Sequence, residues 1–240
     1  MFVDPLAEET MTPYQYVNNN PVNMIDPTGM KGEDWIFHFM NGSLLWFEDT
    51  GKGNNIYFNI DGVKMSLSPE KSGFYTAVVN YIGKSLNPDV NYKYSNVMTN
   101  TGGKFNYETN TVTNNAFKFH NYFDVVSVIE HELIHKKNGS SRGFIDHANV
   151  YFEQASSKTF NKTSEKFKAS HSTQYAQRLL NAYVEGEIDS FDFDSNIKKY
   201  NKLNPKYQIS RNNAQKPKDD ILKVDNTSEI INYKKMNYSE

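Results

Sequence analysis

Two turn-forming dipeptides, Asn41-Gly42 and Asp61-Gly62, constrain the fold of the first third of the chain. Both readily adopt the left-handed backbone conformation that a two-residue hairpin turn requires. Each stands between two short runs of aromatic and aliphatic residues, and the four runs cover residues 35–41, 43–47, 55–60 and 63–67. The pattern therefore predicts two β-hairpins.

Helical spacing dominates the rest of the chain. Apolar residues recur every three or four positions in residues 74–86, and Asn87-Pro88 predicts the end of that helix. After strand-like residues at 105–107 and 111–113, three more helical stretches follow at 122–137, 144–158 and 173–188. Strands followed mainly by helices predict an α+β fold, in which N-terminal hairpins or a small antiparallel sheet precede a helical core.

Composition limits the kinds of site and partner that we expect. The 240 residues carry 26 basic and 28 acidic side chains, so no global positive field favours nucleic acid as a partner. The chain has no cysteine, and any bound metal must be held by His, Asp or Glu. We expect no membrane span, because no run of about 18 apolar residues occurs. We also expect no conventional signal peptide, because acids and proline occupy the start of the chain.

An HExxH motif, His131-Glu132-Leu133-Ile134-His135, lies at the end of an apolar-striped helical stretch. Four residues make about one helical turn, so both imidazoles project from one face and can share one cation. Glu132 lies one position round the helix, where it can reach a metal-bound water without being a ligand. We interpret His131 and His135 as zinc ligands and Glu132 as a general base. The alternative is a pair of surface histidines at helical spacing.

A catalytic zinc ion takes three protein ligands and one water, so the motif needs a third ligand from elsewhere. The next predicted helix, which follows a turn at 138–143, offers three candidates. His147 is the first choice because imidazole suits zinc. Glu153 is the alternative, since a carboxylate on a following helix is a common third ligand, and Asp146 is the third choice.

The HExxH helix resembles that of the zincin metallopeptidases. The metzincin pattern does not fit, because residues 136–142 contain no further histidine. The resemblance implies that zinc acidifies a water, that Glu132 accepts its proton and that a peptide bond is hydrolysed. It also implies a substrate held as an added strand, for which residues 111–117 are a candidate. Candidate donors to the developing oxyanion are Tyr151, His171 and Tyr175.

The first 30 residues are rich in turn formers and carry a second resemblance. Residues 14–30, YQYVNNNPVNMIDPTGM, resemble the end of the core shell of RHS-repeat (YD-repeat) polymorphic toxins. Residues 2–7, FVDPLA, resemble an earlier element of the same shell. The resemblance implies self-cleavage near Met30, with Asp4 and Asp26 matching the paired aspartates of that family. The alternative is that both aspartates only cap turns.

Together the two resemblances divide the chain into an RHS core remnant at 1–30, a metallopeptidase-like toxin domain at 31–195 and a polar C-terminal extension at 196–240. They imply a zinc peptidase that is the toxin tip of an RHS-type system. Such a tip is secreted or delivered into a competing cell by a specialised secretion system, and it cleaves a protein or peptide substrate. Its partners are the RHS shell and a cognate immunity protein.

Two other functions stay open on the sequence alone, an RHS-associated nuclease toxin and a non-enzymatic binding module. The balanced charge disfavours the nuclease. The two remaining histidines near aromatic runs, His38 and His120, are expected to be structural.

Overall fold

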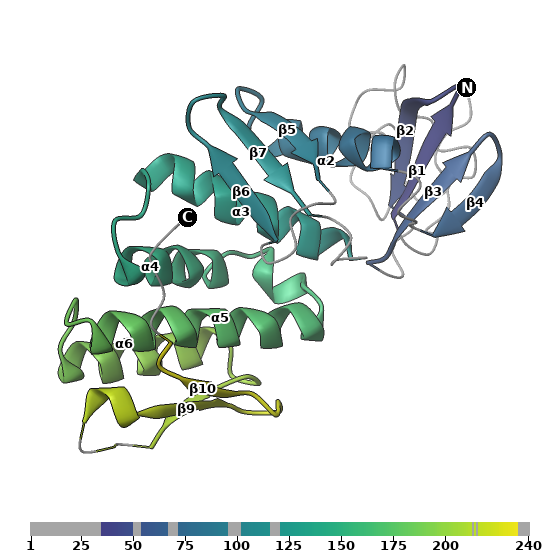
Figure 1. The fold of residues 1–240 in the computed structure, drawn as a ribbon. Coiled ribbons are helices and arrows are strands. Elements are labelled where there is room, and N and C mark those ends of the chain that lie inside the picture. Colours follow the sequence, from purple (N-terminus) through teal and green to yellow (C-terminus); the bar gives the residue numbers. More distant parts are fainter. Residues whose placement is uncertain are drawn as a thin grey trace, which may run out of the picture. The chain divides into compact units, whose positions relative to one another are not determined.

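The computed structural model describes residues 35–49, 54–66, 72–95, 102–115, 121–212, 214 and 216–234. The RHS-like segment at 1–30, with Asp4, Asp26 and Met30, lies outside these residues, as does His120. The fold is α+β, as the sequence predicts (Figure 1). The described residues divide into two compact units: those up to 102 together with those in 113–125 form unit 1, and those in 103–112 together with those from 126 onward form unit 2. A search of the described helices finds none with the length and hydropathy needed to cross a bilayer.

Unit 1 contains a four-stranded sheet, and its strands confirm both predicted hairpins. The strands are β1 (Trp35–Met40), β2 (Ser43–Asp49), β3 (Ile56–Ile60) and β4 (Val63–Ser66), in the order β2-β1-β3-β4. Asn41 and Gly42 turn the first hairpin with φ of 50° and 80°, and Asp61 and Gly62 turn the second with φ of 50° and 86°. Strands β1 and β3 pair in parallel and so join the hairpins. Local turn chemistry does not predict that long-range pairing.

The core of unit 1 forms where helix α2 (Ser72–Leu86) covers the sheet. Phe37 and Phe58 are fully buried. Phe58 meets Tyr75 of α2 edge-on at 5.3 Å between ring centroids, and Phe39 meets Phe74 in the same way at 4.7 Å. Edge-to-face aromatic pairs of this kind stabilise a core beyond their buried area. The predicted helix at 74–86 is therefore confirmed and packs through its apolar stripe.

A further sheet has the strand order β5-β7-β6. Its strands are β5 (Asn91–Tyr94), β6 (Gly103–Asn106) and β7 (Thr111–Asn114). The strand-like residues at 111–113 are confirmed, and those at 105–107 are confirmed except for 107, which lies in a turn. Among the described strands, β7 is paired on both sides and β6 lies at an edge.

The helices of unit 2 confirm the three predicted helical stretches and add a fourth. They are α3 (Tyr122–Asn138), whose residues from Val126 belong to this unit, α4 (Phe144–Ala155), α5 (Glu165–Val184) and α6 (Ser190–Leu203), with a short 3-10 helix η4 (Phe160–Lys162). Helix α5 starts earlier than expected because the Ser164 side chain accepts a hydrogen bond from the Phe167 amide and caps it.

The C-terminus of α3 and the N-terminus of α4 are capped in different ways. Gly139 ends α3 with φ of 83°, the left-handed conformation expected from Asn138-Gly139. At the start of α4, Gly143 has no side chain to cap the helix, and the Glu187 carboxylate accepts from the Phe144 and Ile145 amides at 3.0 and 2.8 Å instead. A Cβ on Gly143 would lie 2.7 Å from Glu187 Oε2, so glycine permits this cap.

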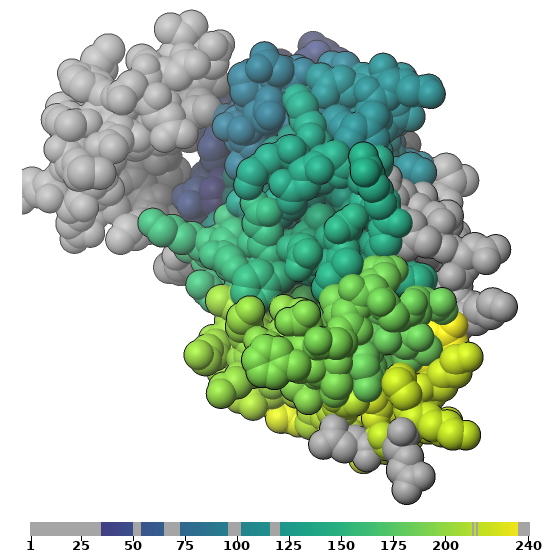
Figure 2. Space-filling model, turned by 90° about the vertical axis from the view of Figure 1, so that its left-hand side faces the viewer, coloured from purple at the N-terminus to yellow at the C-terminus, as the bar shows by residue number. Residues whose placement is uncertain are grey.

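The C-terminal segment differs from the polar extension expected at 196–240, because it forms part of a packed unit. It contains the end of α6 and then β8 (Ile209–Arg211), η5 (Pro217–Asp219), β9 (Ile221–Val224) and β10 (Ile230–Asn232), an antiparallel sheet in the order β10-β9-β8. These residues, yellow in Figure 2, lie against the green residues of α5 and α6. Leu222 and Val224 are buried at alternating positions, a pattern that the polar composition of the segment hides.

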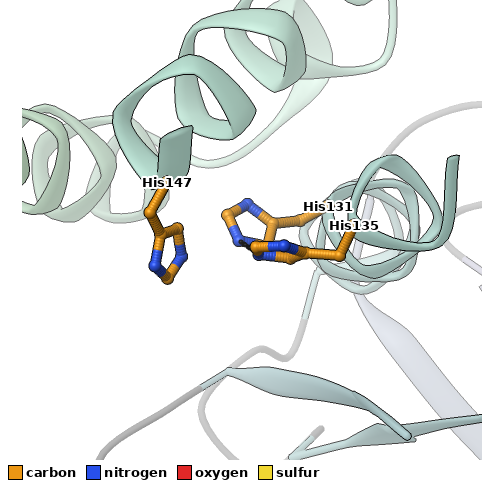
Figure 3. A group of neighbouring side chains, drawn as sticks. All are labelled: His131, His135 and His147. Atoms are coloured by element: carbon orange, nitrogen blue, oxygen red, sulfur yellow. Dashed lines mark hydrogen bonds between the residues drawn. The ribbon is translucent and has the colours of Figure 1, made fainter. Parts of the chain in front are cut away.

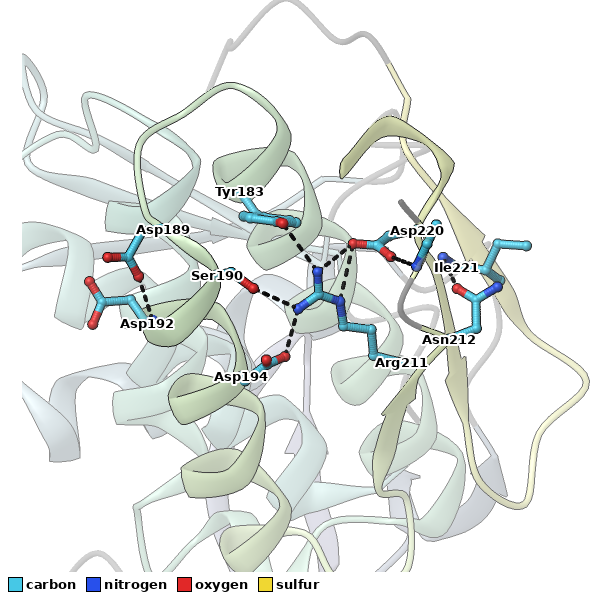
Figure 4. Close-up of polar contacts among 10 residues, drawn as sticks. Tyr183, Asp189, Ser190, Asp192, Asp194, Arg211, Asn212, Asp220 and Ile221 are labelled. Atoms are coloured by element: carbon cyan, nitrogen blue, oxygen red, sulfur yellow. Dashed lines mark hydrogen bonds and ion pairs between the residues drawn. The ribbon is translucent and has the colours of Figure 1, made fainter. Parts of the chain in front are cut away.

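Arg211 ties this sheet to helices α5 and α6 (Figure 4). Its guanidinium donates to Asp220 Oδ2 at 2.7 Å and to Asp194 Oδ1 at 2.8 Å. It also lies over the rings of Tyr183 and Phe193, at 4.9 and 4.8 Å from their centroids. The Asp220 side chain is fully buried, so its charge depends on the arginine for compensation.

Replacing Arg211 with Met is expected to lower the free energy of unfolding by about 3–5 kcal/mol, because Asp220 would keep a buried charge without its partner. Urea unfolding of the full chain measures this. The exposed Arg142, changed to Met, is the matched control and should shift stability by less than about 0.5 kcal/mol. An R211M protein as stable as the control would show that Arg211 does not hold the C-terminal sheet.

Candidate metal centre

Helix α3 buries its HExxH residues in unit 2. His131, Glu132 and His135 are 8%, 5% and 7% exposed, which excludes a pair of surface histidines. The Nε2 atoms of His131 and His135 lie 3.2 Å apart. Zinc–nitrogen bonds of about 2.0–2.1 Å in a tetrahedron separate two ligand nitrogens by about 3.3 Å. The two imidazoles are therefore already spaced as neighbouring ligands of one ion.

Helix α4 brings a third imidazole to the same place. Figure 3 shows His147 of α4 facing His131 and His135 of α3. One ligand atom from each of the three residues lies within 4.8 Å of the other two. His147 is the third ligand that the sequence analysis placed first, and three neutral imidazoles are a donor set that suits zinc.

The two acidic alternatives point elsewhere. Glu153 accepts from Lys137 Nζ at 2.7 Å and from Asn138 Nδ2 at 3.2 Å, on the exposed side of the helix pair. Asp146 accepts from the Arg142 backbone amide at 3.0 Å. Six residues of helix rotate a side chain by about 240°, so Glu153 and His147 cannot serve the same face of α4. The described structure thus brings His147, and neither acid, to the motif.

Burial keeps His131 and His147 neutral. Loss of solvent, followed by repulsion from neighbouring imidazolium, lowers the pKa of His131 to about 3. Burial, then the charges of His131 and Arg178, lowers the pKa of His147 to about 2. Neutral imidazole is the form that binds a metal, so both rings are in their ligand form at neutral pH.

The three oxyanion candidates differ in position. The Tyr151 ring lies beside the cluster, 4.7 Å from His131 and 5.3 Å from His147 between centroids, and burial raises its pKa to about 12. Tyr175 turns away, because its hydroxyl donates to the Asn196 carbonyl at 3.3 Å. His171 has both ring nitrogens in hydrogen bonds to Gln154 and Tyr200. Only Tyr151 of the three is placed to act on a group held at the cluster.

Strand β6 approaches the Glu132 side chain. A Cβ on Gly103, the first residue of β6, would lie 2.9 Å from Glu132 Oε1 and 2.9 Å from Val128 Cγ1. Only glycine lets the strand come this close without displacing the carboxylate. The substrate strand expected at 111–117 is wrong in part, because β7 (111–114) is already paired on both sides and the edge belongs to β6. Residues 116 and 117 lie outside the described residues.

Sequence reasoning gave no role to two residues around the cluster, Gln154 and Arg178. Gln154 lies two helical turns after His147, and its side chain reaches His131 at 2.8 Å. Arg178 lies two turns after His171 on α5, and its Nε is buried without a hydrogen-bond partner. The seven-residue spacing that places each pair on one helix face was the available signal. His38 lies in unit 1, stacked on Trp46 and 3.3 Å from Glu48, apart from this cluster.

Comparison of the chain with protein-family models, curated proteins and solved structures finds no match.

The neutral histidines predict that the metal-free protein loses stability in acid. An unfolded histidine binds a proton below pH about 6.5, whereas the folded state delays protonation of His131 to about 3. Stability is therefore fully present above pH about 6.5 and falls as the pH is lowered toward 3. His131→Asn should reduce the slope of unfolding free energy against pH near pH 5 by about 1.4 kcal/mol per pH unit. Chemical unfolding at several pH values measures this, and an unchanged slope would mean that His131 is not buried as a neutral ring.

Proposed function

We propose that this chain is a zinc-dependent peptidase in which His131, His135 and His147 hold the metal and Glu132 is the general base. The observation that carries the proposal is the convergence of two buried imidazoles of α3 and a half-buried imidazole of α4 next to a buried glutamate. Two of the nitrogens already have the spacing of zinc ligands, 3.2 Å. The helix pair α3–α4 is in this view a zincin-like core.

The donor set favours zinc over the other common biological cations. Calcium and magnesium select oxygen ligands, and the cluster offers only imidazole nitrogen. Three protein ligands leave one position for water, as in catalytic sites. Zinc bound there supplies an acidified water and polarises a substrate carbonyl.

Glu132 follows His131 on α3 and therefore points to one side of the ligand pair. Its carboxylate is 5% exposed and lies beside the start of β6. In the proposed reaction Glu132 accepts a proton from the attacking water and returns it to the leaving amine. Its burial keeps bulk water away from the proton that it transfers.

The edge of β6 is the proposed binding site for a substrate strand. An extended peptide that adds to this edge gains main-chain hydrogen bonds whatever its side chains are. Gly103 lets the edge come close to Glu132, so the scissile bond of an added strand would pass near the general base. The substrate class is accordingly an extended protein or peptide segment.

Tyr151 and Arg178 are the proposed stabilisers of negative charge on the substrate. Tyr151 lies against two of the ligand rings. The positive charge of Arg178 contributes to lowering the pKa of both His131 and His147. A positive guanidinium with an unsatisfied buried Nε can donate to a developing oxyanion or to a substrate carboxylate.

The biological role that we propose is the toxin tip of an RHS-type system. The support is the RHS-like sequence at 1–30, which precedes the peptidase-like residues in the chain. In this role the domain is delivered into a target cell and cleaves a protein there. A cognate immunity protein neutralises it in the producing cell.

Expression of the full chain in bacteria tests the peptidase directly. Glu132→Gln is expected to retain one bound zinc while peptide cleavage falls about 10²–10⁴-fold, because the general base is lost. His131→Ala should lose the zinc as well. Zinc content by elemental analysis, growth of the host and mass-spectrometric mapping of new protein N-termini are the measurements.

The matched control is Glu153→Gln, which removes an exposed acid of α4 and should leave both zinc and cleavage unchanged. Undiminished cleavage by the E132Q protein would refute the assigned role of Glu132. Absence of zinc from the wild-type protein would refute the proposal as a whole.

A further inference from the structure

The buried side chain of Gln154 contacts two histidines from different helices, His131 of α3 and His171 of α5. It is 2% exposed and lies on α4 two turns after His147, on the same helix face. Gln154 Oε1 lies 2.8 Å from His131 Nδ1 and 2.9 Å from His171 Nε2. Gln154 Nε2 lies 2.9 Å from the Ser127 carbonyl and 3.0 Å from Ser127 Oγ.

The orientation of this amide is fixed by chemistry. The carbonyl of Ser127 can only accept a hydrogen bond, so the NH2 group of Gln154 must face it. The oxygen of Gln154 must then face the two histidines. An amide oxygen only accepts, so both histidine nitrogens that meet it must be donors.

The proton positions on the two rings follow. A neutral imidazole carries one N–H, so His131 is protonated at Nδ1 and its Nε2 carries a lone pair, which faces His135 Nε2 at 3.2 Å. His171 is protonated at Nε2, and its Nδ1 accepts from the Tyr200 hydroxyl at 2.7 Å. Each of these hydrogen bonds is consistent with the others.

We propose that Gln154 is a positioning residue that holds His131 in the tautomer whose Nε2 carries the lone pair needed to bind a metal. This Nε2 is the atom that lies 3.2 Å from His135 Nε2 in the candidate metal centre. Outer-shell partners of this kind fix the ring orientation and raise the basicity of the ligand. The inference rests on the proposed zinc site and adds a residue that acts through His131 rather than on substrate.

The choice of glutamine has a physical reason. A carboxylate in its place would also accept from His131, but it would put a negative charge against the Ser127 carbonyl in a buried site. The amide satisfies one carbonyl and two imidazoles without a net charge. It also ties α4 to α3, because Ser127 and His131 both belong to α3.

The proton assignment is tested on the metal-free wild-type protein. Long-range ¹H–¹⁵N correlation spectra of ¹⁵N-histidine-labelled full chain, assigned with single-histidine variants, report which nitrogen of each ring is protonated. The expected result is Nδ1–H for His131 and Nε2–H for His171. An Nε2–H His131 in the wild-type protein would overturn the proposal without any variant that has to fold.

The positioning role is tested by Gln154→Met, which keeps the volume and removes the acceptor. Competition with a chromophoric chelator for Zn²⁺ alone should show affinity lower by about 10–100-fold. Gln174→Met, on the exposed side of α5, is the matched control and should bind Zn²⁺ like the wild type. In the Q154M spectrum, His131 should lose its exclusive Nδ1 protonation, a change that a merely structural role would not produce.

Unchanged zinc affinity in a folded Q154M protein would overturn the positioning role and leave the proposed function standing. Failure of the wild-type protein to bind Zn²⁺ would overturn the proposed function and with it the positioning role. In that case the tautomer of His131 still reports whether the hydrogen bonds are as described.

Discussion

The position of α4 beside α3 determines whether three histidines can meet. Polar contacts at both ends of α4, to Glu187 after α5 and to side chains and backbone of α3, hold the helix there. Glu187 caps the first turn of α4 at distances of 3.0 and 2.8 Å. Gln154 in its last turn donates to the Ser127 carbonyl of α3. Just beyond, Ser157 and Thr159 donate to the Glu130 carboxylate of α3 at 3.1 and 2.9 Å. Glu130 and His131 are neighbours in sequence, so the same stretch of α3 anchors α4 and presents a metal ligand.

Burial of neutral rings is the second constraint on the site. Imidazoles can lie close together in a solvent-poor interior when they are uncharged, and the lowered pKa values of His131 and His147 indicate that these two rings are neutral. A carboxylate ligand in the same place would have to be buried as a charge, and Glu153 and Asp146 remain on the exposed side of α4. Neutral imidazole is the form of the ring that binds a metal ion.

The sequence predicted those features that depend on interactions between residues close together in the chain. Asn41-Gly42 and Asp61-Gly62 require the hairpin turns that they form, and one helical turn between His131 and His135 requires one shared face. The choice of His147 over Glu153 followed from ligand chemistry, whereas the structure supplies the geometric reason. The zinc itself, the peptidase activity and the RHS-type role remain proposals.

Long-range contacts account for what the sequence did not predict. The parallel pairing of β1 with β3 and the edge position of β6 depend on which strands meet, which no turn signal encodes. Helix α6 went unrecognised because its buried residues, Phe193, Ile197 and Tyr200, lie in a polar stretch. Gln154 was visible only as a helix neighbour of His147, because its partners Ser127 and His171 come from α3 and α5.

X-ray absorption at the zinc edge of the purified full chain tests the central claim most directly. The account predicts one zinc per chain with three imidazole nitrogens at about 2.0–2.1 Å and one oxygen ligand. A zinc-free protein, or a zinc shell in which oxygen ligands replace the imidazoles, would contradict it.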